Sequence, residues 1–226
     1  EGTLYDVDLR LRPDGKAGAV ATSIDRLATY FDRDAWIWEK QALTKARPIA
    51  GDTGLSEKIQ KLINSIINHN HPKDRLVAAI SDMRRRIQKQ QKPASRWHLR
   101  QIVGGLTDID LLIQAWRLQH GELFSGSGQT AQIILQTLHD PAVIDDNCLE
   151  NMTEASKCFN EIYHSLRLTL GPAAPTTDSL PIGLHKFMLQ RLDFPDETQF
   201  QHHFNVSVST VVQAINEYLR SAEKAS

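Results

Sequence analysis

The chain has 226 residues, and its 26 Lys and Arg against 27 Asp and Glu leave a formal net charge of −1. This balance excludes the strongly basic field that gathers nucleic acid, and 41% hydrophobic residues exclude a disordered chain. No apolar run approaches the roughly 20 residues that span a bilayer, and no signal peptide is evident. We therefore expect a cytoplasmic protein that binds neither nucleic acid nor membrane.

A β-strand is predicted near the start of the chain, where apolar and charged residues alternate along residues 4–12 and the turn signal Pro13-Asp14-Gly15 follows. One face consists of Tyr5, Val7, Leu9 and Leu11, and the other of Asp6, Asp8, Arg10 and Arg12. The charged face fits a metal and phosphate site, or a solvated face with cross-strand ion pairs. Only Gly18 to Thr22 offers a weak second strand, so we expect the rest of the sheet to be missing upstream or present only as a remnant.

From about Thr22 onward the hydrophobic period becomes that of α-helices. The pattern predicts a mainly α fold, a multi-helix bundle behind the N-terminal strand. Helices are expected at about 22–31, 34–47, 55–66, 72–87, 107–120, 130–139, 149–170, 184–192 and 207–221. Residues 171–181, rich in Gly and Pro, are interpreted as a rigid connector before a C-terminal helical extension.

Several polar positions have more than one interpretation. Arg84, Arg85 and Arg86 are best explained as a solvated helix face. One side of the otherwise apolar helix at 107–120 carries a polar stripe formed by Asp110, Gln114 and Arg117. These side chains are either hydrogen-bonded inside the protein or face a cleft. Cys148 and Cys158 would lie about 15 Å apart on one helix, so free thiols are expected. The His69/His71 and His202/His203 pairs lack zinc-ligand spacing.

Three stretches together resemble one family. They are Y-D-V-D-L-R-L-R-P-D-G (Tyr5 to Gly15), A-W-I-W-E-K-Q-A-L-T-K-A-R-P (Ala35 to Pro48) and G-G-L-T-D-I-D-L-L-I-Q (Gly104 to Gln114). In this order they are similar to the glutamine synthetase adenylyltransferase and adenylyl-removing enzymes, over residues 1 to about 170. The sequence departs from that pattern at His98, Arg100 and Asp110, where an aspartate, a lysine and a glutamate are usual.

The resemblance implies a nucleotidyltransferase sheet whose last strand remains at residues 1–21. A helical bundle shared with PII uridylyltransferases would follow at 22–170, and a helical extension at 171–226. The family uses ATP and Mg²⁺ to transfer AMP to a tyrosine of glutamine synthetase, and its other half removes the AMP by phosphorolysis, which regulates nitrogen metabolism. The chain end at Ser226 favours the C-terminal, adenylylating half. Expected partners are glutamine synthetase and the PII signal protein.

The resemblance also implies roles for particular residues. Asp8 would be the third catalytic carboxylate and a metal ligand, and Arg10 and Arg12 would bind nucleotide phosphate. Supporting or interdomain roles fall to Glu39, Arg47, Arg100, Gly104, Gly105, Asp108, Asp110 and Gln114. With the first two carboxylates absent, the fragment alone is expected to be inactive. The alternatives are a PII uridylyltransferase-type module and a non-catalytic helical interaction domain.

Overall fold

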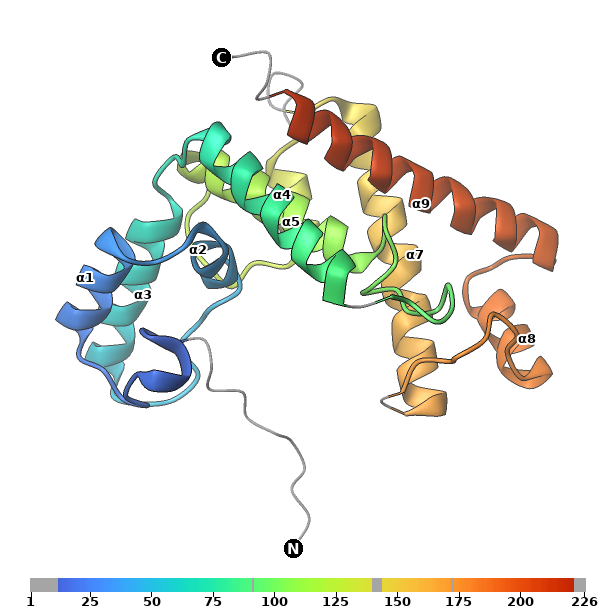
Figure 1. Cartoon of the computed structure of the whole chain (residues 1–226), viewed down its shortest axis with the longest axis horizontal. Coiled ribbons are helices and arrows are strands. Elements are labelled where there is room, and N and C mark those ends of the chain that lie inside the picture. The colour runs from blue at the N-terminus through green and yellow to red at the C-terminus, as the bar shows by residue number, and fades with distance from the viewer. Residues whose placement is uncertain (1–11, 91, 140–143, 172, 222–226) are drawn as a thin grey trace, which may run out of the picture. The chain divides into compact units, whose positions relative to one another are not determined.

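The computed structural model describes residues 12–221 except 91, 140–143 and 172. All regular elements within these ranges are helices (Figure 1), which confirms the mainly α class. The predicted strand at 4–12 lies outside the described residues apart from Arg12. Gly18 to Thr22, the weak second-strand candidate, contains no strand.

The described residues contain nine α-helices. The α-helices are α1 (Ile24–Arg33), α2 (Ile37–Leu43), α3 (Thr53–Ile67), α4 (Lys73–Gln90), α5 (Leu106–Gln119), α6 (Ala131–Thr137), α7 (Asp146–Leu170), α8 (Ile182–Arg191) and α9 (Glu197–Arg220). Two short 3₁₀ helices, η1 (Gly15–Ala17) and η2 (Gly121–Leu123), precede α1 and follow α5. No helix in the described part of the chain is long and apolar enough to cross a membrane.

The chain divides into two compact units. Of the described residues, those within 12–71 and 117–129 form unit 1, and those within 72–116 and 130–221 form unit 2. The last turn of α5 therefore belongs to unit 1 and the rest of that helix to unit 2. The predicted divisions after residues 21 and 170 stay predictions.

Local capping explains where several helices begin. A Ser, Thr or Asp side chain at the N-cap accepts a hydrogen bond from the backbone N–H three residues later, which satisfies a donor that the helix itself cannot pair. The caps are Ser23 before α1, Asp52 before α3, Thr130 before α6, Asp145 before α7 and Asp196 before α9. The first helix thus begins at Ile24 and not at Thr22, because Ser23 takes the capping position.

In unit 1, α1 and α2 both pack against α3. Phe31, Ile63 and Ile67 supply the buried apolar contacts. A buried cation also belongs to this unit: Arg117 is only 1% exposed. It donates hydrogen bonds to the backbone oxygens of Ile67 (3.1 Å) and Gly126 (3.0 Å). For Arg117, the interpretation of the polar stripe as hydrogen-bonded inside the protein is therefore the correct one.

In unit 2, the long helices α7 and α9 pack against each other and form the main core. The Phe159 ring of α7 and the Phe204 ring of α9 lie 5.4 Å apart. Trp97, from the loop before α5, stacks on Phe200 of α9 at 6.3 Å. The prediction that the last helix begins at 207 is wrong. It begins at Glu197, ten residues earlier, and Phe200 and Phe204 lie on its buried face.

The connector after α7 is held against the loop that precedes α5. Ser95 Oγ donates to the Pro175 backbone oxygen (2.5 Å), and the Trp97 indole N–H donates to that of Asp178 (2.9 Å). The Arg96 backbone N–H donates to the Asp178 carboxylate (2.8 Å). The helices α8 and α9 both pack against α7 and belong to the same compact unit.

Both cysteines lie on α7 as free thiols, as predicted. Burial raises the pKa of Cys158 to about 12, with a smaller contribution from the nearby Glu154 charge. Burial also raises the pKa of Cys148, helped by Glu217 and Asp145. Neither thiol has the lowered pKa that a nucleophilic cysteine requires.

Candidate functional site

The predicted site residues are distributed over both units. Asp8 and Arg10 lie outside the described residues. Arg12 is described and half-buried, and its Nε donates a hydrogen bond to the Gly18 backbone oxygen at 3.1 Å. This contact closes the turn that contains η1. The described position of Arg12 thus has a structural role, and its predicted phosphate contact stays a prediction.

Glu39, the predicted supporting residue of unit 1, is 8% exposed and holds α1 to α2. One carboxylate oxygen accepts from the Tyr30 hydroxyl (2.7 Å), and the other from the Trp36 backbone N–H (2.8 Å). Burial, followed by the hydrogen bond and charge of Glu39, raises the pKa of Tyr30 to about 12. Glu39 therefore caps α2 and fixes Tyr30, and its predicted supporting or interdomain role in the enzyme stays a prediction.

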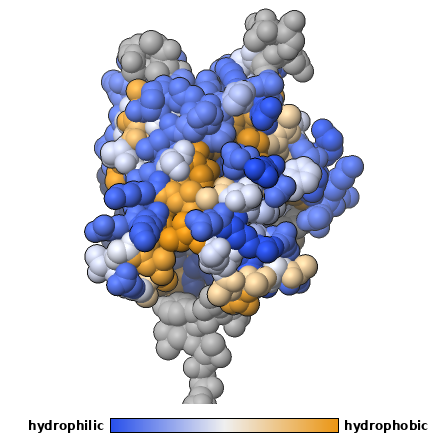
Figure 2. Space-filling view, turned by 90° about the vertical axis from the view of Figure 1, so that its left-hand side faces the viewer, coloured by the Kyte–Doolittle hydropathy of each residue, from blue (hydrophilic) through white to orange (hydrophobic). Residues whose placement is uncertain are grey.

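A mostly apolar cavity of about 310 Å³ lies beside Glu39. Its lining includes Arg12 and Pro13, together with Leu27, Phe31, Ala42, Leu43 and Ile63 from the three helices. On the side of the molecule where α1 and α3 lie, Figure 2 shows apolar side chains exposed between polar ones. Arg47, a further predicted residue, is exposed, and its Cβ lies near Gly128.

In unit 2, Asp108 on α5 is the centre of the predicted glycine segment. It is 6% exposed, and its Oδ2 accepts from the Gly104 backbone N–H at 2.8 Å. The guanidinium of Arg84 on α4 forms a bidentate ion pair with the same carboxylate. Its Nε donates to Oδ1 at 2.8 Å and its Nη2 donates to Oδ2 at 3.0 Å. Two-point pairing of this kind is strong and geometrically specific. Both carboxylate oxygens are thus engaged.

The glycines are required where they stand. Gly104 has a φ of +78°, and a Cβ there would lie 2.6 Å from the Val208 backbone oxygen on α9. A Cβ on Gly105 would lie 2.1 Å from the Leu99 backbone oxygen. That oxygen accepts from the Leu106 backbone N–H at 2.7 Å. The glycines therefore allow close backbone packing on both sides of the loop.

The remaining residues of this segment lie close to one another. An Arg100 Nη1 to Asp110 Oδ2 contact of 3.5 Å joins the loop to α5, with Arg100 51% and Asp110 29% exposed at the side chain. Gln114 lies half-buried one turn further along α5. The hydroxyl of Thr107 donates to the Arg100 backbone oxygen at 2.7 Å. Thr107 was expected to start the helix, but it lies inside it, because α5 begins at Leu106.

Sequence reasoning missed Arg84. Its interpretation as part of a solvated face is wrong, because its side chain is 12% exposed and paired with Asp108. The interpretation as a solvated face fits better for Arg86, which forms an exposed ion pair with Asp82 four residues earlier on the same helix. Arg84 and Asp108 are 24 residues apart on different helices, so no local spacing reveals the pair. The available signal was Asp108 itself, a carboxylate on a helix apolar on most sides, which needs a cation when buried.

The space beside this ion pair is too small for a ligand. The cavity lined by Arg84, Thr107 and Asp108 measures about 10 Å³. That volume holds a single water at most. In the described part of the chain, no group of three or more His, Cys, Asp or Glu could hold a metal ion. We therefore assign no magnesium ligand among the described residues.

The comparisons with known proteins agree with the motifs. A sequence profile of the family described as glutamate-ammonia ligase adenylyltransferase matches residues 1–62. These residues include the first two of the three motifs. Together with the relatives described next, this match confirms the resemblance.

Relatives named bifunctional glutamine synthetase adenylyltransferase/adenylyl-removing enzyme extend the match. The protein of Bartonella quintana (strain Toulouse) is 34% identical over 197 residues, which is 87% of this chain and 20% of the relative. That of Mesorhizobium japonicum (strain LMG 29417 / CECT 9101 / MAFF 303099) is 29% identical over 221 residues, covering 98% of this chain and 22% of the relative. The chain thus spans about a fifth of the curated relatives that it matches.

Proposed function

We propose that the chain works as a supporting helical segment of an enzyme that transfers AMP from ATP to a tyrosine of glutamine synthetase. The observation that carries the proposal is the similarity, over 87% and 98% of the chain, to relatives named bifunctional glutamine synthetase adenylyltransferase/adenylyl-removing enzyme. The described geometry is consistent with support: Glu39 and Asp108 are buried and hydrogen-bonded to backbone and side-chain donors.

Asp8 is the residue proposed to act in the reaction. It would hold Mg²⁺, which when bound neutralises phosphate charge. Arg10 and Arg12 would neutralise further phosphate charge from the same strand face. The tyrosine oxygen would attack the α-phosphorus of ATP and pyrophosphate would leave. In the reverse activity, phosphate would displace tyrosine and release ADP. The first two carboxylates are not supplied by this chain, so the fragment alone is proposed to be inactive.

The proposed setting is cytoplasmic regulation of nitrogen assimilation, with glutamine synthetase as protein substrate and PII as regulatory partner. The test uses the complete polypeptide that contains this sequence, ATP labelled at the α-phosphate, Mg²⁺ and purified glutamine synthetase. We expect label on glutamine synthetase with the wild-type polypeptide and background label with Asp8→Asn. Asp25→Asn, an exposed carboxylate on α1, is the matched control and should keep full activity. Unchanged transfer by Asp8→Asn would remove the catalytic role from this residue.

The two alternatives give different results in the same assay. A PII uridylyltransferase-type module would use UTP and label PII. A non-catalytic interaction domain would retain glutamine synthetase or PII on immobilised 226-residue chain without nucleotide, while the complete polypeptide transfers no label.

A further inference from the structure

The apolar cavity of about 310 Å³ in unit 1 lies at the point where residues 12 and 13 lead into this unit. Arg12 and Pro13 both belong to its lining, and Pro13 is buried. Two leucines that are only partly buried, Leu27 on α1 and Leu43 on α2, line it as well. A segment that covers these walls would gain free energy, because it removes apolar surface from water.

The turn that follows Arg12 is fixed by several contacts. Arg12 Nε donates a hydrogen bond to the Gly18 backbone oxygen at 3.1 Å, so its guanidinium is used within the turn. A salt bridge of 2.7 Å between Arg26 Nη2 and Asp14 Oδ2 joins the same turn to α1. A Cβ on Gly18 would lie 1.9 Å from the Pro13 backbone oxygen, so this close approach requires glycine. These contacts hold Arg12 and Pro13 at the cavity.

The residues just before this turn carry apolar side chains at every second position. Leu9 and Leu11 belong to the apolar face of the predicted strand at 4–12, which lies outside the described residues apart from Arg12. An extended chain spans at most about 3.6 Å per residue, so Leu11 is no more than about 7 Å from Pro13, and Leu9 no more than about 14 Å. Both leucines are within reach of the cavity. Because they are connected to it, their effective concentration there exceeds that of a separate molecule.

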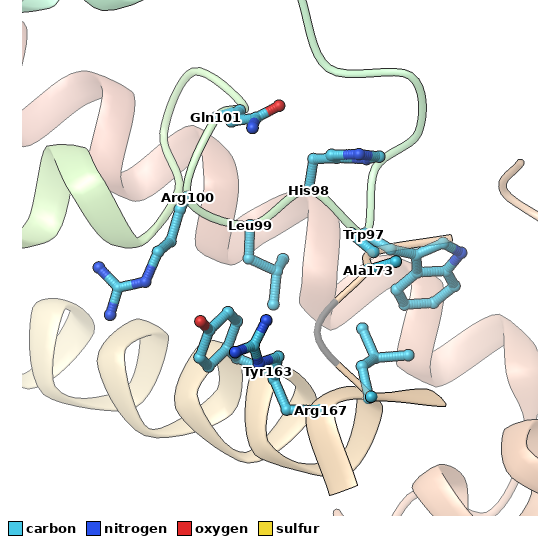
Figure 3. Close-up of a pocket in the computed structure, with 11 residues that line it drawn as sticks. Trp97, His98, Leu99, Arg100, Gln101, Tyr163, Arg167 and Ala173 are labelled. Carbon is cyan, nitrogen blue, oxygen red and sulfur yellow. The ribbon is translucent and has the colours of Figure 1, made fainter. Parts of the chain in front are cut away.

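A cavity in unit 2 does not suit these leucines. It measures about 260 Å³, and Figure 3 shows Arg100, Tyr163 and Arg167 among the side chains that line it. The guanidinium carbons of the two arginines lie 5.1 and 5.8 Å from the centroid of the Tyr163 ring. Apolar side chains placed there would take charged groups out of water, which costs free energy. Of these two cavities, the one in unit 1 fits an apolar segment.

We propose that the side chains of Leu9 and Leu11 occupy the apolar cavity of unit 1. Because successive side chains of an extended segment point to opposite faces, Asp8 and Arg10 then point away from this cavity. The reverse orientation is unfavourable, since charged side chains would lose hydration among apolar walls. For the proposed function, on which this last step rests, the consequence is that unit 1 orients the strand face that carries Asp8.

The test is hydrogen exchange of the 226-residue chain, without nucleotide or metal, measured by mass spectrometry on peptides from α3. Exchange of these amides reports the opening of unit 1. Leu11→Ala should lower their protection about tenfold or more, because it removes a leucine side chain from an apolar cavity. Arg10→Ala is the matched control on the opposite face of the segment, and it should change the protection by less than about twofold.

A double-mutant cycle locates the contact. Leu27→Ala removes an apolar wall of the cavity, so in this background Leu11→Ala should reduce the protection at least about threefold less than in the wild type. Ala42→Leu fills part of the same cavity and replaces Leu27→Ala if that variant fails to fold.

Three results would each overturn the proposal. They are full additivity of the two changes, equal effects of Leu11→Ala and Arg10→Ala, and a coupling that depends on protein concentration, which would place the leucines in the cavity of another copy. Because the exchange experiment measures no AMP transfer, its outcome is independent of whether the complete polypeptide modifies glutamine synthetase.

Discussion

Arg84 on α4 and Asp108 on α5 form a two-point ion pair in which both side chains are nearly removed from solvent, 12% and 9% exposed. The same carboxylate accepts from the Gly104 backbone N–H at 2.8 Å. One buried side chain thus ties together two helices and the glycine loop. Because a buried carboxylate is costly without a cation, the pair should control the stability of this part of unit 2.

Arg84→Met tests the pair. The variant leaves Asp108 buried without its cation, so the free energy of unfolding should fall by about 3–5 kcal/mol. Arg86→Met is the matched control two residues away, because Arg86 is 62% exposed in its pair with Asp82. That change should cost roughly 0.5 kcal/mol or less. Urea unfolding followed by circular dichroism measures both values. Equal losses in the free energy of unfolding would show that the buried Arg84–Asp108 pair stabilises the fold no more than the exposed Arg86–Asp82 pair.

Gly104→Ala should destabilise the chain through two separate effects. The φ of +78° disfavours any residue with a Cβ, and that Cβ would lie 2.6 Å from the Val208 backbone oxygen. Together these predict a loss of about 2–4 kcal/mol. Gly128→Ala has a similar φ of +73° but its nearest neighbour is 3.5 Å away, an ordinary contact. It should lose only about 1–2 kcal/mol in thermal unfolding. A milder effect at Gly104 than at Gly128 would contradict the close approach to α9.

Arg117→Lys tests the buried cation of unit 1. Arg117 donates to the backbone oxygens of Ile67 and Gly126 and lies 4.1 Å from the Phe124 ring centroid. Burial lowers its pKa to about 10, so it stays charged at neutral pH. Lysine keeps the charge but cannot reach both oxygens from one planar group, and a loss of about 2–3 kcal/mol is expected. Arg33→Lys, at an exposed position on α1, should be neutral. Chemical denaturation monitors both, and a neutral Arg117→Lys would mean that charge alone suffices.

His71 predicts a specific pH dependence. Burial lowers its pKa from the usual 6.5, and its Nε2 lies 3.0 Å from the Ile66 backbone oxygen, so the neutral ring donates there. Below pH 6.5 the unfolded chain binds a proton that the folded chain does not. Stability should therefore fall as the pH decreases from 6.5. His71→Gln should flatten this dependence between pH 7 and 5, and His202→Gln, on an exposed position of α9, should not. Identical pH profiles for wild type and His71→Gln would refute the assignment.

Much of the helical fold could be predicted because its signals are local. The apolar stripe of α7 acts within one helix, although the predicted helix starts at 55 and 149 fall two and three residues after Thr53 and Asp146. The start of α9 was missed because polar residues, including His202 and His203, lie between Phe200 and Phe204. They obscure the four-residue spacing of these two apolar residues, which indicates a helix. Tertiary packing on Trp97 and Phe159 decides that segment.

The candidate site was predictable only in part, for the same reason. Glu39 accepts a hydrogen bond from the backbone N–H of Trp36, three residues earlier, so this contact can be predicted from the local sequence. The partner of Asp108 is on another helix and could not be found from spacing. The Arg100–Tyr163–Arg167 cluster likewise joins a loop to a distant helix. Contacts between segments far apart in sequence depend on the packed fold.

The most direct measurement for the proposed function is the intact mass of glutamine synthetase after incubation with the complete polypeptide, Mg²⁺ and either ATP or UTP. The proposed activity predicts a mass increase of one AMP on a tyrosine with ATP, and its reversal with phosphate and release of ADP. No adduct on glutamine synthetase with ATP would contradict it, and a UMP adduct on PII in a parallel incubation that contains PII and UTP would favour the uridylyltransferase alternative.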